Sequence, residues 1–369
     1  MDVTQLPDIP HIGAQFDIAG ALIKAEPFTH GHINDTYVAT YHQNGTDRRY
    51  VHQRINHHVF KQPLQVMENI ARVTDHIRQK FTAQNYPDID RRVLRLVPSR
   101  DGKTYHLTPD GNYWRTYLFI EDARIYDVVE SPKEAYQAAK EYGYFQQLLT
   151  DLPGGRLHDT IPDFHNTPKR FTTFARARKT DAHQRAASCH NEIQFAIEHQ
   201  PITTILLDLH AKGEIPERVT HNDTKFNNVM LDNATGEGIC VLDLDTVMPG
   251  LALYDFGDMI RTTTSESAED ERDLTKVHME MEMFEALARG YLSTAGAFLN
   301  PVEKAHLAFS GKLITFEIGL RFLTDYLEGD HYFKIHRPGH NLDRCRTQFK
   351  LVESIEEQEA EMNALVARL

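Results

Sequence analysis

Polar and apolar residues alternate through the first third of the chain, as they do in half-buried β-strands. Four segments show this alternation or a high content of β-prone residues: 28–40, 49–55, 93–97 and 114–120. Asn44-Gly45 predicts a tight hairpin between the first two segments, and a polar turn at 109–112 predicts a second hairpin. Residues 63–81 instead place apolar side chains at helical spacing. The first third therefore predicts a small antiparallel sheet with one helix.

Beyond residue 121 the periodicity becomes helical. Helices are expected over 135–150, 169–183, 189–210 and most of the chain from 268 onward. Two short apolar strands, 229–231 and 239–242, interrupt this region. We therefore expect an α+β, bilobal protein. Its small antiparallel β N-terminal lobe would span 1–121, and its large, mainly helical C-terminal lobe 122–369.

Composition narrows the expected partners. The 369 residues are 41% hydrophobic and 25% charged, as in ordinary globular chains, and the formal net charge is −13. Nucleic acid and anionic membrane surfaces reward clustered Lys and Arg, so neither is expected as a partner. No stretch approaches the roughly 18 apolar residues of a membrane span. The N-terminus lacks the pattern of a signal peptide, and three scattered cysteines indicate reduced thiols, so a cytoplasmic location is expected.

The most informative motif is His221-Asn-Asp-Thr-Lys-Phe-Asn-Asn228, followed by an apolar strand that ends in Asp243. In ATP-dependent phosphoryl transfer, one Asp accepts the proton of the attacking hydroxyl, while an Asn and a second Asp hold Mg²⁺. We therefore predict a kinase with Asp223 as the catalytic base and Asn228 and Asp243 as metal ligands. An Asp that merely caps a turn is the structural alternative for Asp223, and the accompanying His221 and Asn228 argue against it.

Four other residues in or near the motif also have predicted roles, and for two of them, Asp245 and Lys225, the spacing allows alternatives. Asp245 points to the same side as Asp243 if the strand continues. We assign it to the acceptor site, with a second metal ligand or a solvated strand-end carboxylate as alternatives. Lys225 either offsets charge on the transferred phosphoryl group or is a surface lysine. His221 is expected to brace the loop backbone, and Asp255 to anchor the loop from the start of a helix.

Nucleotide contacts are expected from the first lobe. Gly31, with flanking polar residues that include Asn34, is a candidate loop over the phosphates because it precedes the first hairpin. An ordinary turn is the alternative. Arg54 on the next strand would contact the α- and β-phosphates, with Glu68 on the following helix as its partner, unless it is simply a partly solvated arginine. The lobe ends near Glu121, which is also assigned to the nucleotide site.

These motifs resemble those of the aminoglycoside phosphotransferase and choline kinase superfamily. Val51-His-Gln-Arg-Ile55 is similar to its first-lobe signature, and the His221–Asn228 motif with Leu242-Asp243 is similar to its two catalytic signatures. Within that superfamily, longer stretches resemble N-acetylhexosamine 1-kinases: 31–34, 221–228, 242–249, 254–258, 320–326 and 340–342. The resemblance covers about residues 25–350 and implies a protein-kinase-like fold.

The resemblance also implies a chemistry. ATP and Mg²⁺ would be the co-substrates, and the acceptor would be a sugar, GlcNAc or GalNAc, phosphorylated at its anomeric C1 hydroxyl to give the sugar 1-phosphate. Sugar contacts would come from His32, Asp223, Asp243, Arg321 and Tyr332. Asn222 departs from the superfamily pattern, because members often have Gly at this position.

The charges of the late helices bear on the acceptor. Choline or a polycationic aminoglycoside calls for carboxylates or an aromatic cage. The late helices instead offer several arginines, among them Arg321 and Arg337, and the single tryptophan, Trp114, lies in the first lobe. A neutral sugar therefore fits better, although surface ion pairing with Glu317 or Asp325 is the alternative for these arginines. A choline- or aminoglycoside-type kinase and a nucleotide-binding pseudokinase stay open as alternative functions.

Overall fold

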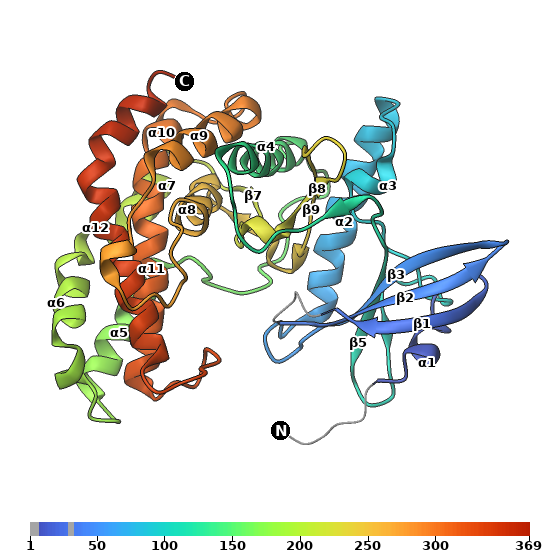
Figure 1. Ribbon diagram of the computed structural model, residues 1–369, viewed down its shortest axis with the longest axis horizontal. Coiled ribbons are helices and arrows are strands. Elements are labelled where there is room, and N and C mark those ends of the chain that lie inside the picture. The colour runs from blue at the N-terminus through green and yellow to red at the C-terminus, as the bar shows by residue number, and fades with distance from the viewer. Residues whose placement is uncertain (1–6, 29–32) are drawn as a thin grey trace.

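The computed structural model describes residues 7–28 and 33–369, which form an N-terminal sheet followed by a larger helical part (Figure 1). The sheet is antiparallel, with the strand order β1-β2-β3-β5-β4. Its strands are β1 (Ala21–Pro27), β2 (Asp35–Gln43), β3 (Thr46–Arg54), β4 (His106–Leu107) and β5 (Tyr113–Leu118). Helices α1 (Ile9–Gly13), α2 (Pro63–Ala83) and α3 (Ile89–Arg92) belong to the same part of the chain.

The predicted hairpin is confirmed, and one predicted strand is not. Asn44 and Gly45 join β2 to β3 with φ of 51° and 83°, the left-handed backbone that such a two-residue turn needs. Residues 93–97 form no regular strand. Leu96 makes a single bridge to Tyr117 instead, and Val97 N–H donates to the Thr116 carbonyl at 2.8 Å. Because α3 ends directly before this segment, only a short stretch of it lies along β5.

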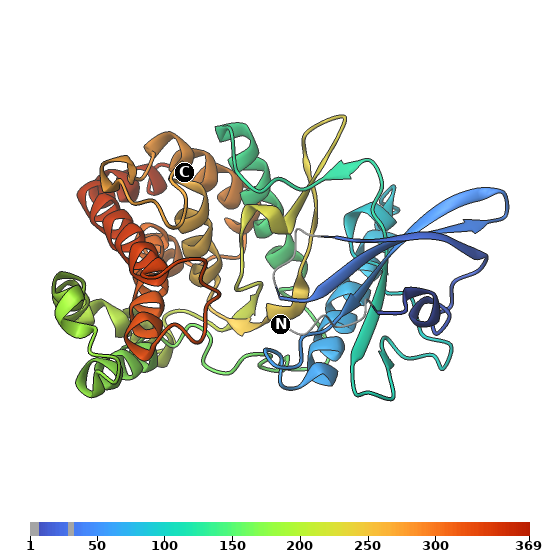
Figure 2. The same cartoon turned by 60° about the horizontal axis from the view of Figure 1, so that its bottom comes forward.

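The two faces of the sheet have different neighbours, because successive side chains of a strand point to opposite sides. Tyr50 and Trp114 lie on the outer face, in an aromatic core with Phe16. Val51 and Tyr117 lie on the inner face, which is turned toward the helical part. Helix α2 covers this inner side and lies between the sheet and the helical part in both ribbon views (Figures 1 and 2).

The helical part contains two small sheets among its helices. Strand β6 (Ala123–Arg124) pairs with β8 (Val229–Asp232), β8 pairs with β9 (Gly238–Val241), and β7 (Arg218–Thr220) pairs with β10 (Met248–Gly250). The helices are α4 (Pro132–Leu148), α5 (Thr167–Thr180), α6 (His190–Glu198), α7 (Ile205–Ala211), α8 (Ala252–Thr263), α9 (Met281–Ala295), α10 (Pro301–Ala305), α11 (Leu307–Glu328) and α12 (His340–Val366). The α+β, protein-kinase-like architecture is therefore confirmed.

Two of the predicted helical regions are interrupted in the structure. The segment 189–210 is divided into α6 and α7 by a 3-10 turn, Gln200–Thr204. Pro201 lies at the start of that turn and has no N–H with which to continue an α-helix. Beyond 268, long irregular segments separate α8 from α9 and α11 from α12. The second of these, 329–339, carries Tyr332, which contacts Arg321 of α11.

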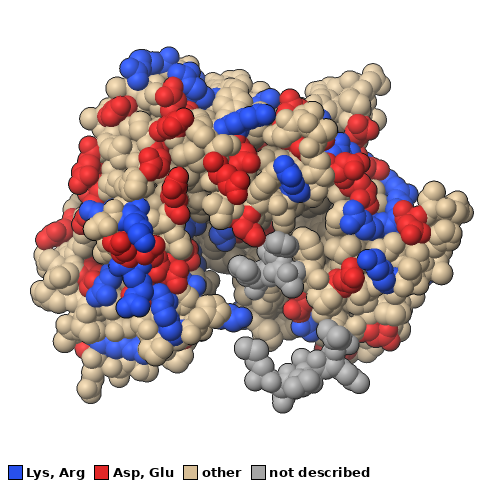
Figure 3. All heavy atoms as spheres, viewed as in Figure 1, with Lys and Arg blue, Asp and Glu red and all other residues tan. Residues whose placement is uncertain are grey.

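The face of the molecule shown in Figure 3 has no large patch of a single charge. Acidic and basic side chains are interspersed over the face shown in Figure 3, and many are joined in ion pairs, such as Arg337 with Asp270 at 3.2 Å. Within the described residues, no helix is long and apolar enough to cross a membrane.

Candidate active site

The loop after β7 holds the H-x-D motif in a fixed shape. Backbone N–H groups of His221 and Asn222 donate to the buried Asp255 carboxylate at 2.9 and 2.7 Å, and Gln146 donates to it at 2.6 Å. His221 Nε2 lies 2.7 Å from the Leu242 carbonyl oxygen, so His221 ties the loop to the end of β9. Asn222 has φ of 65°, a left-handed conformation that Asn tolerates better than most residues. His221 and Asp255 thus have the bracing positions that the sequence predicted.

Asp223 is held as an ionised carboxylate by basic neighbours. Lys225 Nζ lies 2.9 Å from its Oδ1, and Asn228 Nδ2 donates to its backbone carbonyl at 2.9 Å. Burial acts to raise the pKa of Asp223, but the combined attraction of Lys225, His221 and Arg261 outweighs it and holds this pKa below its usual value. The side chain remains 23% exposed. It can therefore accept a hydrogen bond from a bound molecule while charged at neutral pH.

Asp243 follows β9 with a left-handed φ of 53° and opens toward the cleft. Desolvation in the cleft, followed by repulsion from the Asp245 and Asp223 carboxylates, raises the pKa of Asp243 to about 8, even though the side chain keeps contact with solvent. A bound cation would relieve the repulsion that Asp243 experiences from the Asp223 carboxylate. This part of the cleft is therefore suited to a metal ion.

Asn228 and Asp243 fit Mg²⁺ in type and position. Both line the same cavity. Because Asn228 commits its Nδ2 to Asp223, its Oδ1 is the atom left for a ligand. The described part of the chain has no group of three or more His, Cys, Asp or Glu residues arranged to hold a metal. Mg²⁺ commonly binds one or two protein oxygens and completes its shell with phosphate and water oxygens.

Asp245 is buried instead of facing an acceptor. Its carboxylate accepts hydrogen bonds from both terminal nitrogens of Arg115, one of them at 2.7 Å, and from Asn34 Nδ2 at 2.7 Å. The Asp245 side chain is only 2% exposed. The assignment of Asp245 to the acceptor site is therefore corrected, because β9 ends before it and the chain turns at Asp243 into a 3-10 segment, Leu244–Thr246. Asn34 is likewise engaged in this buried network.

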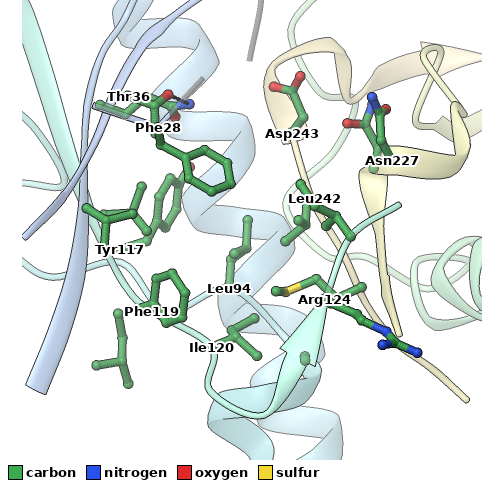
Figure 4. A pocket seen from close by; sticks show the side chains of 18 of the residues that line it. Phe28, Thr36, Leu94, Tyr117, Phe119, Ile120, Arg124, Asn227, Leu242 and Asp243 are labelled. Carbon is green, nitrogen blue, oxygen red and sulfur yellow. Dashed lines mark hydrogen bonds between the residues drawn. The ribbon is translucent and has the colours of Figure 1, made fainter. Parts of the chain in front are cut away.

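A cavity of about 360 Å³ lies between the inner face of the sheet and the catalytic loop (Figure 4). Apolar side chains line much of it, including Val51, Phe119 and Leu242. Polar groups gather at one end, where Asn227 and Asp243 lie near each other in Figure 4. The cavity thus has an apolar slot leading to a polar, metal-suited end.

Arg54 and Glu68 do not have the contacts predicted for them. Arg54 Nε donates to Asp35 at 2.7 Å, whereas its neighbour Gln53 lines the cavity. Arg54 therefore lies on the outer face of the sheet, because adjacent residues of a strand point to opposite sides. Glu68 on α2 pairs with His158 at 2.9 Å and makes no hydrogen bond or ion pair with Arg54 among the described residues.

Of Gly31, Glu121 and His32, which the sequence assigned to the nucleotide and acceptor sites, the structure describes only Glu121. Gly31 and His32 lie outside the described residues. Glu121 pairs with Arg49 and is 49% exposed, and it is absent from the lining of the cavity. Its backbone carbonyl accepts from Arg91 Nε at 3.1 Å. The structure thus places Glu121 beside the connection between the two parts of the chain and outside the cavity itself.

Arg321 and Tyr332 come together from α11 and the following loop. Arg321 Nη2 lies 3.4 Å from the Tyr332 hydroxyl. The guanidinium carbon also lies 5.6 Å from the Phe164 ring centre and 5.4 Å from that of Phe333, distances at which a cation and an aromatic face attract each other. Tyr332 is 66% exposed. The pair forms a wall with one cation, one hydroxyl and several aromatic rings.

This wall is connected to the catalytic loop by buried hydrogen bonds. Glu317, one helical turn before Arg321, lies 2.9 Å from His165 Nδ1 and accepts from Thr167 Oγ1 at 2.6 Å. The other ring nitrogen of His165 lies 3.3 Å from the Asn222 carbonyl oxygen. The residue before Asp223 and the helix that bears Arg321 therefore share one buried partner.

A buried carboxylate shapes the loop that carries Tyr332. Asp325 Oδ1 accepts from the N–H groups of His331 and Tyr332 at 2.9 and 2.8 Å, and its Oδ2 accepts from Phe333 N–H at 2.9 Å and Asn341 Nδ2 at 2.8 Å. Such a set fixes the loop backbone against α11 and α12. Among the residues that the structure describes, Arg321 makes no ion pair with Asp325. The surface ion pairing expected as the alternative does occur for Arg337, although with Asp270 and Asp343 as partners.

Sequence reasoning missed Arg115, the cation of β5 that faces the cavity. It is 1% exposed and donates to Gln53 as well as to Asp245. A signal was present, because Arg115 stands between Trp114 and Tyr117 in a strand that reads as buried, and a buried charge requires a partner. The sequence did not indicate which carboxylate would supply it.

Comparison with known proteins agrees with this geometry. Residues 24–297 match the model of the phosphotransferase enzyme family. The fold is similar to that of an aminoglycoside phosphotransferase from Alicyclobacillus acidocaldarius, with a TM-score of 0.63 and 14% sequence identity over 99% of this chain and 98% of that one. It is also similar to a choline kinase from Cryptosporidium parvum, with a TM-score of 0.53 and 14% identity over 94% of this chain and 92% of that one.

A microcompartment-associated aminopropanol kinase has a similar fold as well, with a TM-score of 0.55 and 15% identity over 96% of this chain and 98% of that one. At such identities the likeness concerns the fold. The family match covers well over half of the chain and includes the whole His221–Asn228 motif and Asp243. The chain therefore belongs to the phosphotransferase enzyme family.

Proposed function

We propose that this protein transfers the terminal phosphoryl group of ATP to a sugar hydroxyl, with Mg²⁺ held by Asn228 and Asp243 and with Asp223 as the general base. The supporting observation for the chemistry is the position of Asp223. Lys225 favours the ionised form of the Asp223 carboxylate, the side chain is partly exposed, and its backbone carbonyl accepts a hydrogen bond from one proposed metal ligand, Asn228. A general base needs this combination of charge and access.

The cavity supports the placement of the nucleotide. Its apolar walls suit a purine base, because an aromatic ring loses little by leaving water for an apolar slot. The triphosphate would then extend toward Asn228 and Asp243 at the polar end. Mg²⁺, when bound there, would neutralise phosphate charge. Among the solved relatives, the GDP complex of an aminoglycoside 2'-phosphotransferase shows that this fold accommodates a nucleotide.

The reaction can be written with this chain's own residues. Asp223 takes the proton of the acceptor hydroxyl, and the hydroxyl oxygen bonds to the γ-phosphorus of ATP. The bond between that phosphorus and the bridging oxygen of ADP breaks, and ADP leaves. Lys225 offsets negative charge beside Asp223, at the 2.9 Å contact of their side chains. Catalysis of this kind rests on positioning and charge stabilisation.

We further propose that the acceptor is an N-acetylhexosamine, GlcNAc or GalNAc, phosphorylated at its anomeric C1 hydroxyl. The single observation that supports this choice is the wall formed by Arg321 and Tyr332. Acidic groups near this wall have partners already: Glu317 faces His165, and Asp325 accepts backbone N–H groups. A neutral sugar with hydroxyl and amide oxygens suits a guanidinium fork better than a cationic acceptor does.

A cationic acceptor is the second candidate, because choline and aminoglycoside kinases share this fold. A cationic acceptor at this wall would be repelled by the Arg321 guanidinium. The nearby carboxylates of Glu317 and Asp325 already have hydrogen-bond partners. A pseudokinase that binds nucleotide without transfer is the third candidate. The charged state of Asp223 and the open side of Asp243 argue against it.

Phosphorus NMR tests all three candidates in one experiment. The protein is incubated with ATP, Mg²⁺ and, separately, GlcNAc, GalNAc, glucose, galactose, choline and kanamycin. We expect an anomeric sugar phosphate with GlcNAc or GalNAc, formed at least about 10² times more slowly by Asp223→Asn. Phosphocholine or phosphorylated kanamycin as the main product would refute the sugar assignment, and bound nucleotide without any product would favour the pseudokinase.

A further inference from the structure

A buried ion pair joins the N-terminal sheet to the turn that carries Asp243. Arg115 of β5 and Asp245 have side chains that are 1% and 2% exposed. Arg115 donates to Asp245 through both terminal nitrogens, and it donates to Gln53 through Nε at 2.8 Å and Nη2 at 2.6 Å. The guanidinium therefore has protein partners on every side, as does the Asp245 carboxylate.

The network continues to the chain that follows β1. Asn34 Nδ2 donates to Asp245 Oδ2 at 2.7 Å, and Asn34 Oδ1 accepts from Asn56 N–H at 2.9 Å. Asn34 and Asp245 are 211 residues apart in sequence. Arg115 of β5 and Asn34, which precedes β2, thus contact one carboxylate of the helical part, and Gln53 of β3 joins the network through Arg115.

Stability alone does not account for such a pair. Removing two charges from water is costly, and apolar residues of similar size commonly replace a buried ion pair without loss of stability. The alternative is a role in placing a neighbour. Asp245 lies two residues after Asp243, within the 3-10 segment Leu244–Thr246 that begins directly after Asp243. Asp243 itself has a left-handed φ of 53° and lines the cavity.

We propose that Arg115 and Asp245 are positioning residues, through which the N-terminal sheet sets the orientation of the Asp243 carboxylate toward a bound metal–nucleotide complex. This inference rests on the proposed nucleotide and Mg²⁺ site. Because the ion pair joins the sheet to the turn that begins at Asp243, a shift of the sheet would also move Asp243. Neighbours that orient a metal ligand commonly alter metal affinity 10- to 100-fold when they are removed.

Two variants separate this role from folding. Asp245→Asn removes the charge and leaves Arg115 buried without its partner, which lowers stability. The double variant Arg115→Met with Asp245→Leu removes both charges, and we expect its urea midpoint to recover toward that of the wild type. The matched control is Lys312→Met with Glu359→Leu. That pair joins α11 to α12 at 2.6 Å with side chains 12% and 25% exposed, away from the cavity.

The measurement is ADP affinity by calorimetry, with and without Mg²⁺. For the wild type and the control, we expect Mg²⁺ to tighten ADP binding. In both Asp245 variants, that Mg²⁺-dependent gain should fall about tenfold or more, while metal-free ADP affinity stays within about twofold of wild type. A stably folded double variant with the full Mg²⁺-dependent gain would overturn the positioning role alone. If even the wild type shows no effect of Mg²⁺, the proposed metal site and this inference both fail.

Discussion

Removing the Asp255 side chain should detach the catalytic loop, residues 221–228, from helix α8. Its carboxylate accepts hydrogen bonds from His221 N–H, Asn222 N–H and Gln146 Nε2, and it is fully buried. Asp255→Ala leaves these donors without an acceptor. A buried donor left unsatisfied costs about 1–3 kcal/mol. Because water can enter the space left by the carboxylate, we expect a total loss of about 3–6 kcal/mol in the free energy of unfolding.

The same change should slow the reaction more than it weakens nucleotide binding. The Asp255 carboxylate touches the backbone directly before Asp223, whereas the apolar walls of the cavity come from other segments. A displacement of a catalytic group by about 1 Å commonly lowers kcat by about 10². We therefore expect kcat to fall by about that factor, with ADP affinity close to that of the wild type.

Urea unfolding at pH 7 and steady-state kinetics measure these effects, with Asp325→Ala as the matched control. Asp325 is likewise a buried carboxylate that accepts backbone N–H groups, three against the two that Asp255 accepts, but they belong to the loop of Tyr332. We expect a comparable loss of stability in the control, together with a raised KM for the acceptor. If Asp255→Ala unfolds at the wild-type urea concentration, or slows turnover no more than the control does, the bracing argument is wrong.

Three further predictions concern single side chains. Asp223→Asn should lower kcat by about 10² or more and leave ADP affinity nearly unchanged, since the base is lost and the cavity is not. Arg321→Lys should raise the KM for GlcNAc about tenfold without changing that for ATP, because Lys lacks the planar fork. Burial lowers the pKa of His52 to about 4. The folded state therefore favours neutral imidazole, and stability should be complete above pH 6.5 and fall by about 2–3 kcal/mol toward pH 4.5, as urea unfolding can measure.

Each of these predictions has its own control. Equal turnover by Asp223→Asn and the wild type would remove Asp223 from the base role. Arg337→Lys, in an ion pair with Asp270, should leave the KM for GlcNAc unchanged. An equal rise in both arginine variants would contradict a specific role for Arg321. His52→Gln should flatten the acid dependence of stability, and an unchanged dependence in that variant would assign it to other groups.

The sequence by itself determined what depends on neighbours along the chain. Three of the four predicted strand segments, the hairpin at Asn44-Gly45 and the helix α2 follow from local backbone preference and periodicity, and the structure has them. The spacing of Asp223 and Asn228 is also local, because a single loop and a 3-10 turn, Phe226–Asn228, bring the two together. These features need no information from the rest of the molecule.

Only the tertiary structure decided which charged residues face the cleft. Arg54 and Arg115 both stand on strands, but the pairing of the sheet turns the first outward and the second inward. The assignment of Asp245 to the acceptor site was wrong for a similar reason, because its partner Arg115 is 130 residues away in sequence. A buried charge must find its counter-charge wherever packing places one. Local sequence reveals the need for such a partner, and the fold determines its identity.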